Sequence, residues 1–233
     1  MIANPFFRRL DRLSRLSNAD ISALDNLFDE EREITKKKDI VPAGYKLTKV
    51  YLVEHGFGIR YKLLPSGKRQ VLNVILPGYI IGLSAAIFSR SPWSVMSLTV
   101  MSLKAAPFDR FIETCYARPA IAIAMMSLSE QKHAYVSERL ADIGRRTPIE
   151  RVAHFIIEIR ERLRAVGYVV GNDLETPLSQ EVIADCLGLS MPHVNRMLRK
   201  LKEMRLITTR DQVMTLTNQT ELGLLAGCDP TMS

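Results

Sequence analysis

The segment from residue 178 to 217 carries the side chains whose types and spacing best suit a chemical task. Between Ser190 and Arg210 it holds six lysines and arginines against a single acidic residue, Glu203. A local excess of positive charge of this kind is typical of a surface that contacts phosphate groups. The six cationic residues are Arg196, Arg199, Lys200, Lys202, Arg205 and Arg210.

Two short helices are predicted to hold these cations. Ser179 suits the start of a first helix, and Gly188 suits its end. After Leu189, Ser190 suits the start of a second helix, in whose first turn Pro192 loses no hydrogen bond. Apolar residues recur in both helices at helical spacing, which predicts one inward-facing side on each. They are Val182, Ile183 and Leu187 in the first helix and Val194, Met197, Leu198 and Leu201 in the second.

A small β-hairpin is predicted after the second helix. The stretch LITTRDQVMTLT has two β-rich runs on either side of Arg210-Asp211-Gln212, which suits a turn. Two helices joined by a tight turn and followed by a hairpin are the outline of a winged helix-turn-helix, which binds DNA. The alternative is a solvated basic face on a helical hairpin. The ordered succession of cap, turn, second cap and hairpin favours the winged form.

The composition favours a globular protein with an anionic partner. The 233 residues suffice for one large or two modest domains, and the net charge is +7. The basic signal is local, because residues 144–233 hold 12 Lys and Arg against 11 Asp and Glu. No apolar run approaches the roughly 18 residues of a membrane span, and the N-terminus lacks a signal-peptide pattern, so we expect a cytoplasmic protein. The three cysteines, Cys115, Cys186 and Cys228, are too far apart in sequence to predict a disulfide framework or a metal site.

Residues 39–104 are predicted to form a small β-domain. Short β-rich runs alternate there with glycines, which can adopt the positive φ that turns require. This spacing predicts an antiparallel sandwich or barrel, with a jelly roll as the natural candidate. The glycines are Gly44, Gly56, Gly67, Gly78 and Gly82, and the runs are VYLV at 50–53, IRYKLL at 59–64, QVLNVIL at 70–76 and SVMSLTVMSL at 94–103.

A long helix is predicted from about Arg118 to Ile143. About 24 helical residues span roughly 36 Å, which is too long for a small β-domain to bury alone, so we expect a partner helix. An isolated surface helix is the alternative. The residues expected on the dimer face are Ile121, Met125, Leu128 and Tyr135.

Gly144-Arg145-Arg146 is the predicted hinge after this helix. Thr147, Pro148 and Glu150 then form a strong start for another helix, which should continue to about Val166. A loop is expected from Gly167 to Pro177. The predicted fold class is therefore α+β, with a double-stranded β-helix (jelly roll) sensor domain at 1–117, a dimerisation helix at 118–143 and a winged helix-turn-helix domain at 144–233.

This order of parts resembles the Crp/Fnr family of bacterial transcription regulators. The resemblance runs from about Asp20 to Gly223, and its most specific pieces are the glycine series, the PGYIIG turn at 77–82 and LSQEVIADCLGLSMPHVNRMLRKLKEMRLI. It implies a cyclic nucleotide-binding-like jelly roll and a homodimer joined through the long helix. It also implies two recognition helices on a pseudo-palindromic DNA site, with RNA polymerase as a further partner.

The resemblance assigns DNA contacts to individual residues. In the cyclic-AMP receptor protein the recognition helix begins with a Glu, followed four residues later by an Arg. Arg196 matches the Arg and can form a bidentate contact to guanine, whereas Pro192 stands at the position of the Glu and implies a different half-site. Asn195 and His193 are the next candidates for base contacts, although Asn195 suits a phosphate contact or a solvated surface equally well. Backbone contacts are expected from Ser179, Gln180, Ser190, Arg199, Lys200 and Lys202.

The resemblance weakens at the effector site. After the glycine that matches Gly82, cyclic-nucleotide binders have a Glu for the ribose and, further on, an Arg-Ser pair for the phosphate. This chain has Leu83 and Trp93-Ser94 there, so we do not expect cyclic AMP to bind in the family manner. An apolar effector pocket around Gly82, Leu83, Trp93 and Ser94 is one possibility, and packed core is the other.

Other sensor types were tested in the same way. Iron–sulfur sensors of the family use an N-terminal cysteine group, whereas no cysteine precedes Cys115 here. A haem ligand is not expected either, because His55 is the only histidine in the β-rich region and suits a solvated loop. Cys186 in the first helix of the DNA-binding pair is a candidate redox switch, since its oxidation would hinder DNA binding, with an inert core thiol as the alternative. We predict no cofactor.

Two other functional classes were weighed. An enzyme is not expected, because the four histidines are scattered and neither a nucleophile elbow nor a P-loop is present. The second is a ligand-binding protein whose C-terminal domain binds protein rather than DNA. The sequence predicts a DNA-binding regulator whose effector stays open.

Overall fold

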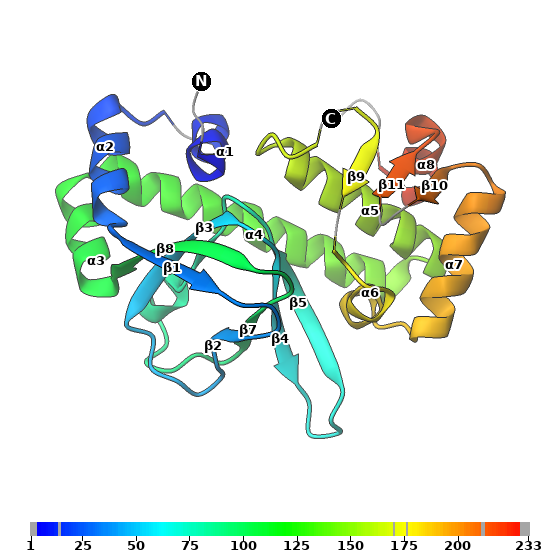
Figure 1. Cartoon of the computed structure of the whole chain (residues 1–233), viewed down its shortest axis with the longest axis horizontal. Coiled ribbons are helices and arrows are strands. Elements are labelled where there is room, and N and C mark those ends of the chain that lie inside the picture. The colour runs from blue at the N-terminus through cyan, green and yellow to red at the C-terminus, as the bar shows by residue number, and fades with distance from the viewer. Residues whose placement is uncertain (1–3, 14, 170, 176, 211–212, 229–233) are drawn as a thin grey trace. The chain divides into compact units, whose positions relative to one another are not determined.

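The computed structural model describes residues 4–13, 15–169, 171–175, 177–210 and 213–228, apart from the side chains of residues 11 and 12. The chain divides into two units, Met1–Ala134 and Tyr135–Ser233, and each is described by itself (Figure 1). The division falls inside one long helix, α4 (Pro119–Arg145), which contributes its first part to one unit and its last part to the other. Within the described residues no helix is long and apolar enough to cross a membrane.

Two four-stranded antiparallel sheets build the β-domain of the N-terminal unit, which is the predicted jelly roll in an α+β fold (Figure 1). Its strands bury alternate residues, as in β8, where Met101, Leu103 and Ala105 are fully buried. One sheet has the order β1 (Glu30–Ile34), β8 (Met101–Pro107), β3 (Lys49–His55) and β6 (Ile80–Ile81); the other has the order β2 (Asp39–Val41), β7 (Ser94–Ser97), β4 (Gly58–Leu63) and β5 (Arg69–Ile75).

The predicted glycine turns are confirmed, since all five glycines have positive φ. The requirement for glycine is strictest at Gly56 and Gly82. A Cβ on Gly56 would lie 2.3 Å from the carbonyl oxygen of Val100, and a Cβ on Gly82 would lie 2.4 Å from that of Lys49. Neither position can hold a side chain without a shift of the backbone, so the close strand packing depends on glycine.

Helices cover one side of this β-domain and form its main core. Ile121, Met125 and Leu128 of α4 are buried there with Phe6 and Phe28, so their prediction as a dimer face is wrong. The physical reason is that α1 and α2, which the sequence analysis did not predict, cover this face within the same chain. The helices of this unit besides α4 are α1 (Pro5–Leu13), α2 (Asn18–Leu27), the 3-10 helix η1 (Leu83–Ala86) and α3 (Phe108–Ala117).

The C-terminal unit combines the last part of α4 with four helices and a three-stranded antiparallel sheet (Figure 1). Helix α5 packs against α6, α7 and α8. The helices are α5 (Pro148–Arg164), α6 (Gln180–Leu187), α7 (Met191–Glu203) and α8 (Gln219–Ala226), and the sheet has the order β10 (Ile207–Arg210), β11 (Val213–Leu216) and β9 (Asp173–Glu175).

Three local expectations need correction. Gly144 and Arg145 belong to the last turn of α4, so only Arg146 and Thr147 separate it from α5 and the predicted three-residue hinge is too long. The expected loop at 167–177 contains strand β9, which adds to the edge of the hairpin. The single run at 94–103 forms two strands, β7 and β8. The predicted turn residues Asp211 and Gln212 lie outside the described residues.

Candidate nucleic-acid interface

The capping residues explain where helix α6 begins and ends and where helix α7 begins. The hydroxyl of Ser179 accepts a hydrogen bond from the Val182 amide at 3.3 Å, and Gly188 ends α6 in the left-handed conformation with φ 63°. Ser190 has the extended backbone of an N-cap, but its hydroxyl makes no capping hydrogen bond. Pro192 lies in the first turn of α7, as predicted. The helix-turn-helix is therefore encoded locally.

One face of α7 packs inward and the other is exposed. Val194 and Leu201 are fully buried, and Met197 and Leu198 are nearly so. On the opposite face the side chains of Asn195 and of the α7 cations are exposed to solvent, and His193 beside them is partly buried. Arg199 has only a 3.6 Å ion pair with Glu203 on its own helix, and both side chains are about two-thirds exposed. These groups are free to turn toward an anionic partner because little holds them in place.

The other predicted contact residues lie around this face. Ser179 and Ser190 are exposed at the starts of the two helices, Gln180 is partly buried, and Lys200 and Lys202 are exposed near the end of α7. The sequence analysis missed Met191, which is 54% exposed in the first turn of α7 beside the candidate base-contacting residues. It also missed the exposed side chains of Thr208 and Thr209 on β10. Exposure of a long apolar side chain has no sequence signal of its own.

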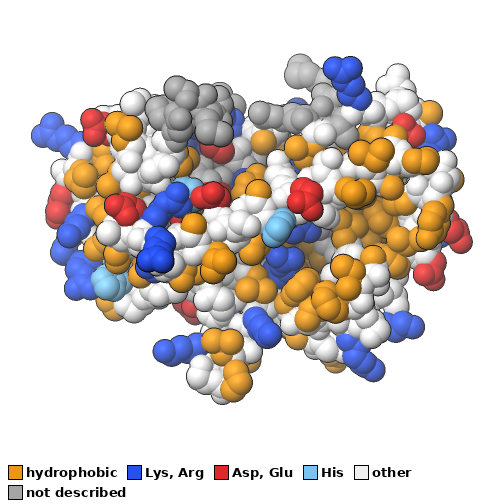
Figure 2. Space-filling model, turned by 180° about the vertical axis from the view of Figure 1, so that it is seen from behind, with side chains coloured by type: hydrophobic (Ala, Val, Ile, Leu, Met, Phe, Trp, Pro, Cys, Tyr) orange, Lys and Arg blue, Asp and Glu red, His pale blue; other side chains and the backbone are white. Residues whose placement is uncertain are grey.

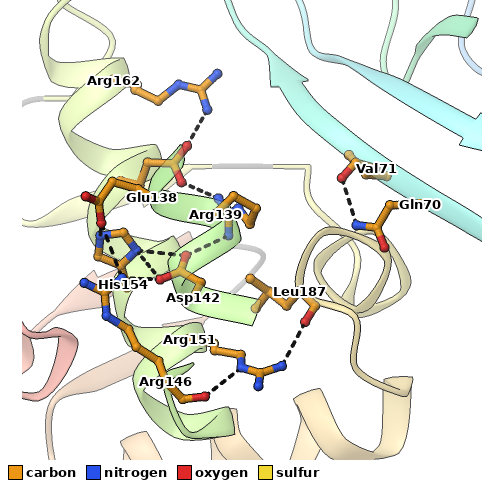
Figure 3. A network of polar contacts seen from close by, with 11 residues as sticks. Gln70, Val71, Glu138, Arg139, Asp142, Arg146, Arg151, His154, Arg162 and Leu187 are labelled. Atoms are coloured by element: carbon orange, nitrogen blue, oxygen red, sulfur yellow. Dashed lines mark hydrogen bonds and ion pairs between the residues drawn. The ribbon is translucent and has the colours of Figure 1, made fainter. Parts of the chain in front are cut away.

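A buried polar network joins the last part of α4 to α5 within the C-terminal unit (Figure 3). Its centre is Asp142, whose side chain is fully buried. The carboxylate is 2.9 Å from Nδ1 of His154 on α5, forms an ion pair with Arg146, and lies 3.6 Å from Arg139. Arg139 also pairs with Glu158 on α5. Because every buried charge here has an opposite charge beside it, the network fixes α4 against α5 rather than loosening the unit.

The network shifts the pKa of both central groups. Burial lowers the pKa of His154, but its hydrogen bonds to Asp142 and Cys228 and the charge of Asp142 raise it further, to about 9. Burial raises the pKa of Asp142, but hydrogen bonds and charge from His154, Arg146 and Arg139 bring it below its usual value. His154 is therefore protonated near neutral pH, and the pair is ionic.

Arg151 continues the connection from α5 toward the DNA-binding pair. Its Nε donates to the carbonyl oxygen of Arg146 at 2.8 Å, and its Nη1 donates to that of Leu187 at 3.4 Å (Figure 3). Leu187 is the last residue of α6. The carbonyl groups at the ends of α4 and α6 are thus satisfied by one side chain, which ties the helix-turn-helix to the end of α4.

The four residues of the expected effector pocket do not share one set of neighbours. Leu83 packs against the helical core, and the Ser94 hydroxyl accepts a hydrogen bond from the Ala43 amide at 3.0 Å. Trp93 instead faces a cation, with the guanidinium carbon of Arg60 4.6 Å from its ring centroid, as well as Phe88. The Arg60 guanidinium beside Trp93 does not fit a purely apolar lining, which was one of the two possibilities.

Cys186 is buried in α6, and its side chain lies in the core of the C-terminal unit. Burial, the largest cause, raises the pKa of its thiol to about 12. The thiolate, which is the species that reacts with oxidants and alkylating agents, is therefore nearly absent at neutral pH. This placement favours the inert core thiol over the redox switch.

We predict that iodoacetamide modifies Cys228, which is partly buried, well before Cys186 in the folded protein. Mass spectrometry of timed digests measures the two rates, and unfolding in urea should make them similar. A Cys186 that is alkylated or oxidised by peroxide as fast as Cys228 in the native protein would contradict this expectation and restore the redox switch.

Metal binding finds no support in the described part of the chain, where no group of three His, Cys, Asp or Glu side chains could hold an ion.

Comparison with known proteins places the chain among transcription regulators. Residues 150–225 match the Crp-like helix-turn-helix domain. The transcriptional activatory protein AadR of Rhodopseudomonas palustris is 33% identical over 68% of this chain and 65% of its own length, slightly under two thirds. The nitrogen fixation regulation protein FixK of Bradyrhizobium diazoefficiens is 31% identical over 81% of this chain and 78% of its own length.

A solved structure supports the fold over most of the chain. FixK2 from Bradyrhizobium japonicum superimposes with a TM-score of 0.77 over 84% of this chain and 96% of its own, at 24% identity. These relatives are regulators by name, which excludes the enzyme alternative. With a jelly roll, a long helix and a helix-turn-helix in this order, and with such relatives, the chain belongs to the Crp/Fnr family of bacterial transcription regulators.

Proposed function

We propose that this regulator binds a pseudo-palindromic DNA site as a homodimer, with α7 in the major groove. The observation that carries the proposal is the exposed face of α7, whose cations lie in solvent and, among the described residues, form a single ion pair, that of Arg199 with the exposed Glu203. Arg196 and Asn195, together with His193, are the proposed base contacts. The proposed backbone contacts are Ser179, Gln180, Ser190, Arg199, Lys200 and Lys202.

Salt dependence of binding to duplex DNA tests this proposal. Each phosphate contact releases counterions, so affinity for both cognate and random duplexes should fall steeply as salt rises. Selection of bound duplexes from a random pool supplies the half-site. Absence of any binding at low salt would overturn the proposal and favour a C-terminal domain that binds protein.

The proposed dimer face lies on the exposed side of α4. Met126, Val136, Leu140 and Ile143 are exposed there by 68%, 39%, 73% and 36%, respectively. With Ser129 and His133 they follow the alternating three- and four-residue spacing of a coiled-coil seam. The surface in Figure 2, seen from behind, carries hydrophobic side chains between its charged ones. A second copy of α4 is the occupant whose own repeat matches this seam.

We predict that Leu140→Asp converts the dimer to a monomer and weakens binding to the full site far more than to random DNA. The reason is that a charge in a two-stranded seam has no partner to neutralise it. Sedimentation at micromolar concentration measures the assembly. Ala141→Asp, at an exposed position of α4 that faces away from the seam, is the matched control and should remain dimeric. A Leu140→Asp protein that sediments as a dimer would refute this seam.

The remaining parts of the proposal follow from the family. We infer that the protein acts in the cytoplasm and contacts RNA polymerase when it regulates transcription. We infer that neither cyclic AMP nor haem nor an iron–sulfur cluster is its signal, on the grounds given for Leu83, Trp93, His55 and the cysteines.

A further inference from the structure

Three cations from three different elements meet in the N-terminal unit. They are Arg9 on α1, Arg60 on β4 and Lys132 on α4. Burial, and then the charges of Arg60 and Arg9, lower the pKa of Lys132 to about 8. Arg60 and Arg9 therefore both lie within electrostatic reach of Lys132.

Arg60 has no carboxylate partner among the described residues. Its guanidinium carbon lies 4.6 Å from the Trp93 ring centroid, and within the same residues its buried Nε has no hydrogen-bond partner. Burial lowers the pKa of this guanidinium, a shift that the charge of Tyr79 partly offsets. A buried charge with an unsatisfied donor is costly unless an anion compensates it.

Lys132, like Arg60, has no carboxylate partner among the described residues. Among the described residues, none of the ion pairs of the N-terminal unit includes Arg60 or Lys132; the carboxylates used are those of Asp20, Asp25, Asp29, Glu30, Glu54 and Glu130. Arg60 and Lys132 therefore have no carboxylate partner in the described part of the unit, although both are partly withdrawn from solvent.

Neutral polar groups lie beside two of the three cations, Arg9 and Arg60. Arg9 donates to the side-chain oxygen of Gln131 at 2.9 and 2.7 Å and to the carbonyl oxygen of Gly78 at 3.3 Å, and its guanidinium lies 4.1 Å from the Tyr79 ring centroid. Asn73 on β5 is buried and lies directly opposite Arg60 in the sheet, so both side chains point to the same face. These contacts fix the position of the Arg9 side chain, and Asn73 places a neutral amide beside Arg60.

We propose that Arg60, Lys132 and Arg9 form a binding site for a small oxyanion that carries carboxylate or phosphate groups. The planar guanidinium of Arg60, which lies over the Trp93 ring, can form bidentate hydrogen bonds to such a group. Lys132 adds a point charge, and Asn73 can supply a neutral donor from the neighbouring strand. The ligand is small because it must lie among partly buried side chains.

The site differs in most of its residues from the effector pocket considered around Gly82, Leu83, Trp93 and Ser94. Of those four positions only Trp93 takes part, and it does so as the surface on which Arg60 stacks. The inference does not rest on DNA binding, so the two proposals stand or fall separately.

Trp93 makes the site directly measurable, because it is the only tryptophan in the chain. An anion that engages Arg60 changes the cation stacked on the indole, so it should change the fluorescence. The full-length protein is titrated with inorganic phosphate and, separately, with succinate, each at constant ionic strength made up with chloride. We expect a saturable change with at least one of them and none with chloride; which of the two saturates identifies the charged group.

Two variants and a control test the assignment. Lys132→Met and Arg60→Met each keep the length of the side chain and should raise the Kd for the active anion at least tenfold. Lys62→Met, an exposed position on the same strand, should leave it unchanged. Since Arg60→Met alters the fluorescence itself, thermal unfolding provides a second readout through the anion-dependent rise in Tm.

Thermal unfolding in the absence of the anion tests whether Lys132 is repelled by the neighbouring cations. Lys132→Met should raise Tm in chloride alone, because it removes a like charge from the cluster, and should abolish the rise on adding the anion. A wild-type protein that responds equally to phosphate, succinate and chloride would overturn the site. So would a Lys132→Met protein that keeps the full anion response.

Discussion

Arg196→Ala is expected to weaken binding to the cognate site by about 1–3 kcal/mol while sparing most of the affinity for random DNA. Arg196 is exposed on the face of α7 opposite its buried stripe, and its removal disturbs no packing. A base contact contributes only where the correct base is present, whereas phosphate contacts contribute on any sequence. Titrations of a selected cognate duplex and a scrambled duplex at the same salt concentration measure the two effects.

Arg199→Ala is the matched control one turn further along the same helix. As a phosphate contact it should weaken binding to both duplexes about equally and reduce the slope of affinity against salt by about one unit. Equal losses on the two duplexes for Arg196→Ala would show that Arg196 contacts phosphate only. The base contacts would then have to come from Asn195, His193 or the exposed Met191.

The DNA-binding pair was predictable from sequence because its signals are local. Ser179, Gly188 and Pro192 each act on the helix end in which they stand, and the buried stripe of α7 follows from spacing alone. The strands between the glycines were predictable for the same reason. Local chemistry fixes the turns, whatever packs around them.

The proposed dimer face was not predictable, because α4 is apolar on two sides. Ile121 and Leu128 lie on one side and Met126 and Leu140 on the other, and spacing cannot tell which side is covered by the same chain. The answer depends on α1 and α2, which pack there through tertiary contacts. The proximity of Arg60 to Lys132 was not predictable for the same reason: it depends on tertiary contacts. The two residues are distant in sequence, and neither belongs to a recognisable motif.

The connection between the proposed dimer face on α4 and the recognition helix α7 also depends on tertiary contacts. Val136, Leu140 and Ile143 belong to the same unit as α7, because the last part of α4 is fixed to α5 by Asp142, His154 and their partners. A dimer made through these residues would therefore set the position of each recognition helix through the network of Figure 3. In such a dimer, a stronger network would fix the distance between the two recognition helices more tightly. The protein would then discriminate more strongly between DNA sites with different half-site spacings.

Asp142→Ala is expected to destabilise the C-terminal unit by about 3–5 kcal/mol, the usual cost of removing one partner from a buried ionic group. It leaves the positive charges of His154, Arg146 and Arg139 facing one another without a central carboxylate. Urea unfolding followed by helical circular dichroism measures the loss. Trp93 fluorescence reports the N-terminal unit separately and should shift little. Glu138→Gln removes a carboxylate that is 57% exposed at the edge of the same network and should cost less than about 1 kcal/mol.

The pH dependence of stability provides an independent check on the same network. His154 has a pKa of about 9 in the folded chain against an ordinary 6.5, so its stabilisation is complete below pH 6.5 and is lost as the pH rises through 9. The loss over this window amounts to about 3 kcal/mol. The pKa of Asp142 is lowered, so its contribution is present above its ordinary value and disappears only as the pH falls into the acid range. Unfolding of the wild type between pH 6 and 9 should therefore show a decline that His154→Gln lacks. A parallel decline in both proteins would mean that the buried pair is not ionic and that α4 is held to α5 by packing alone.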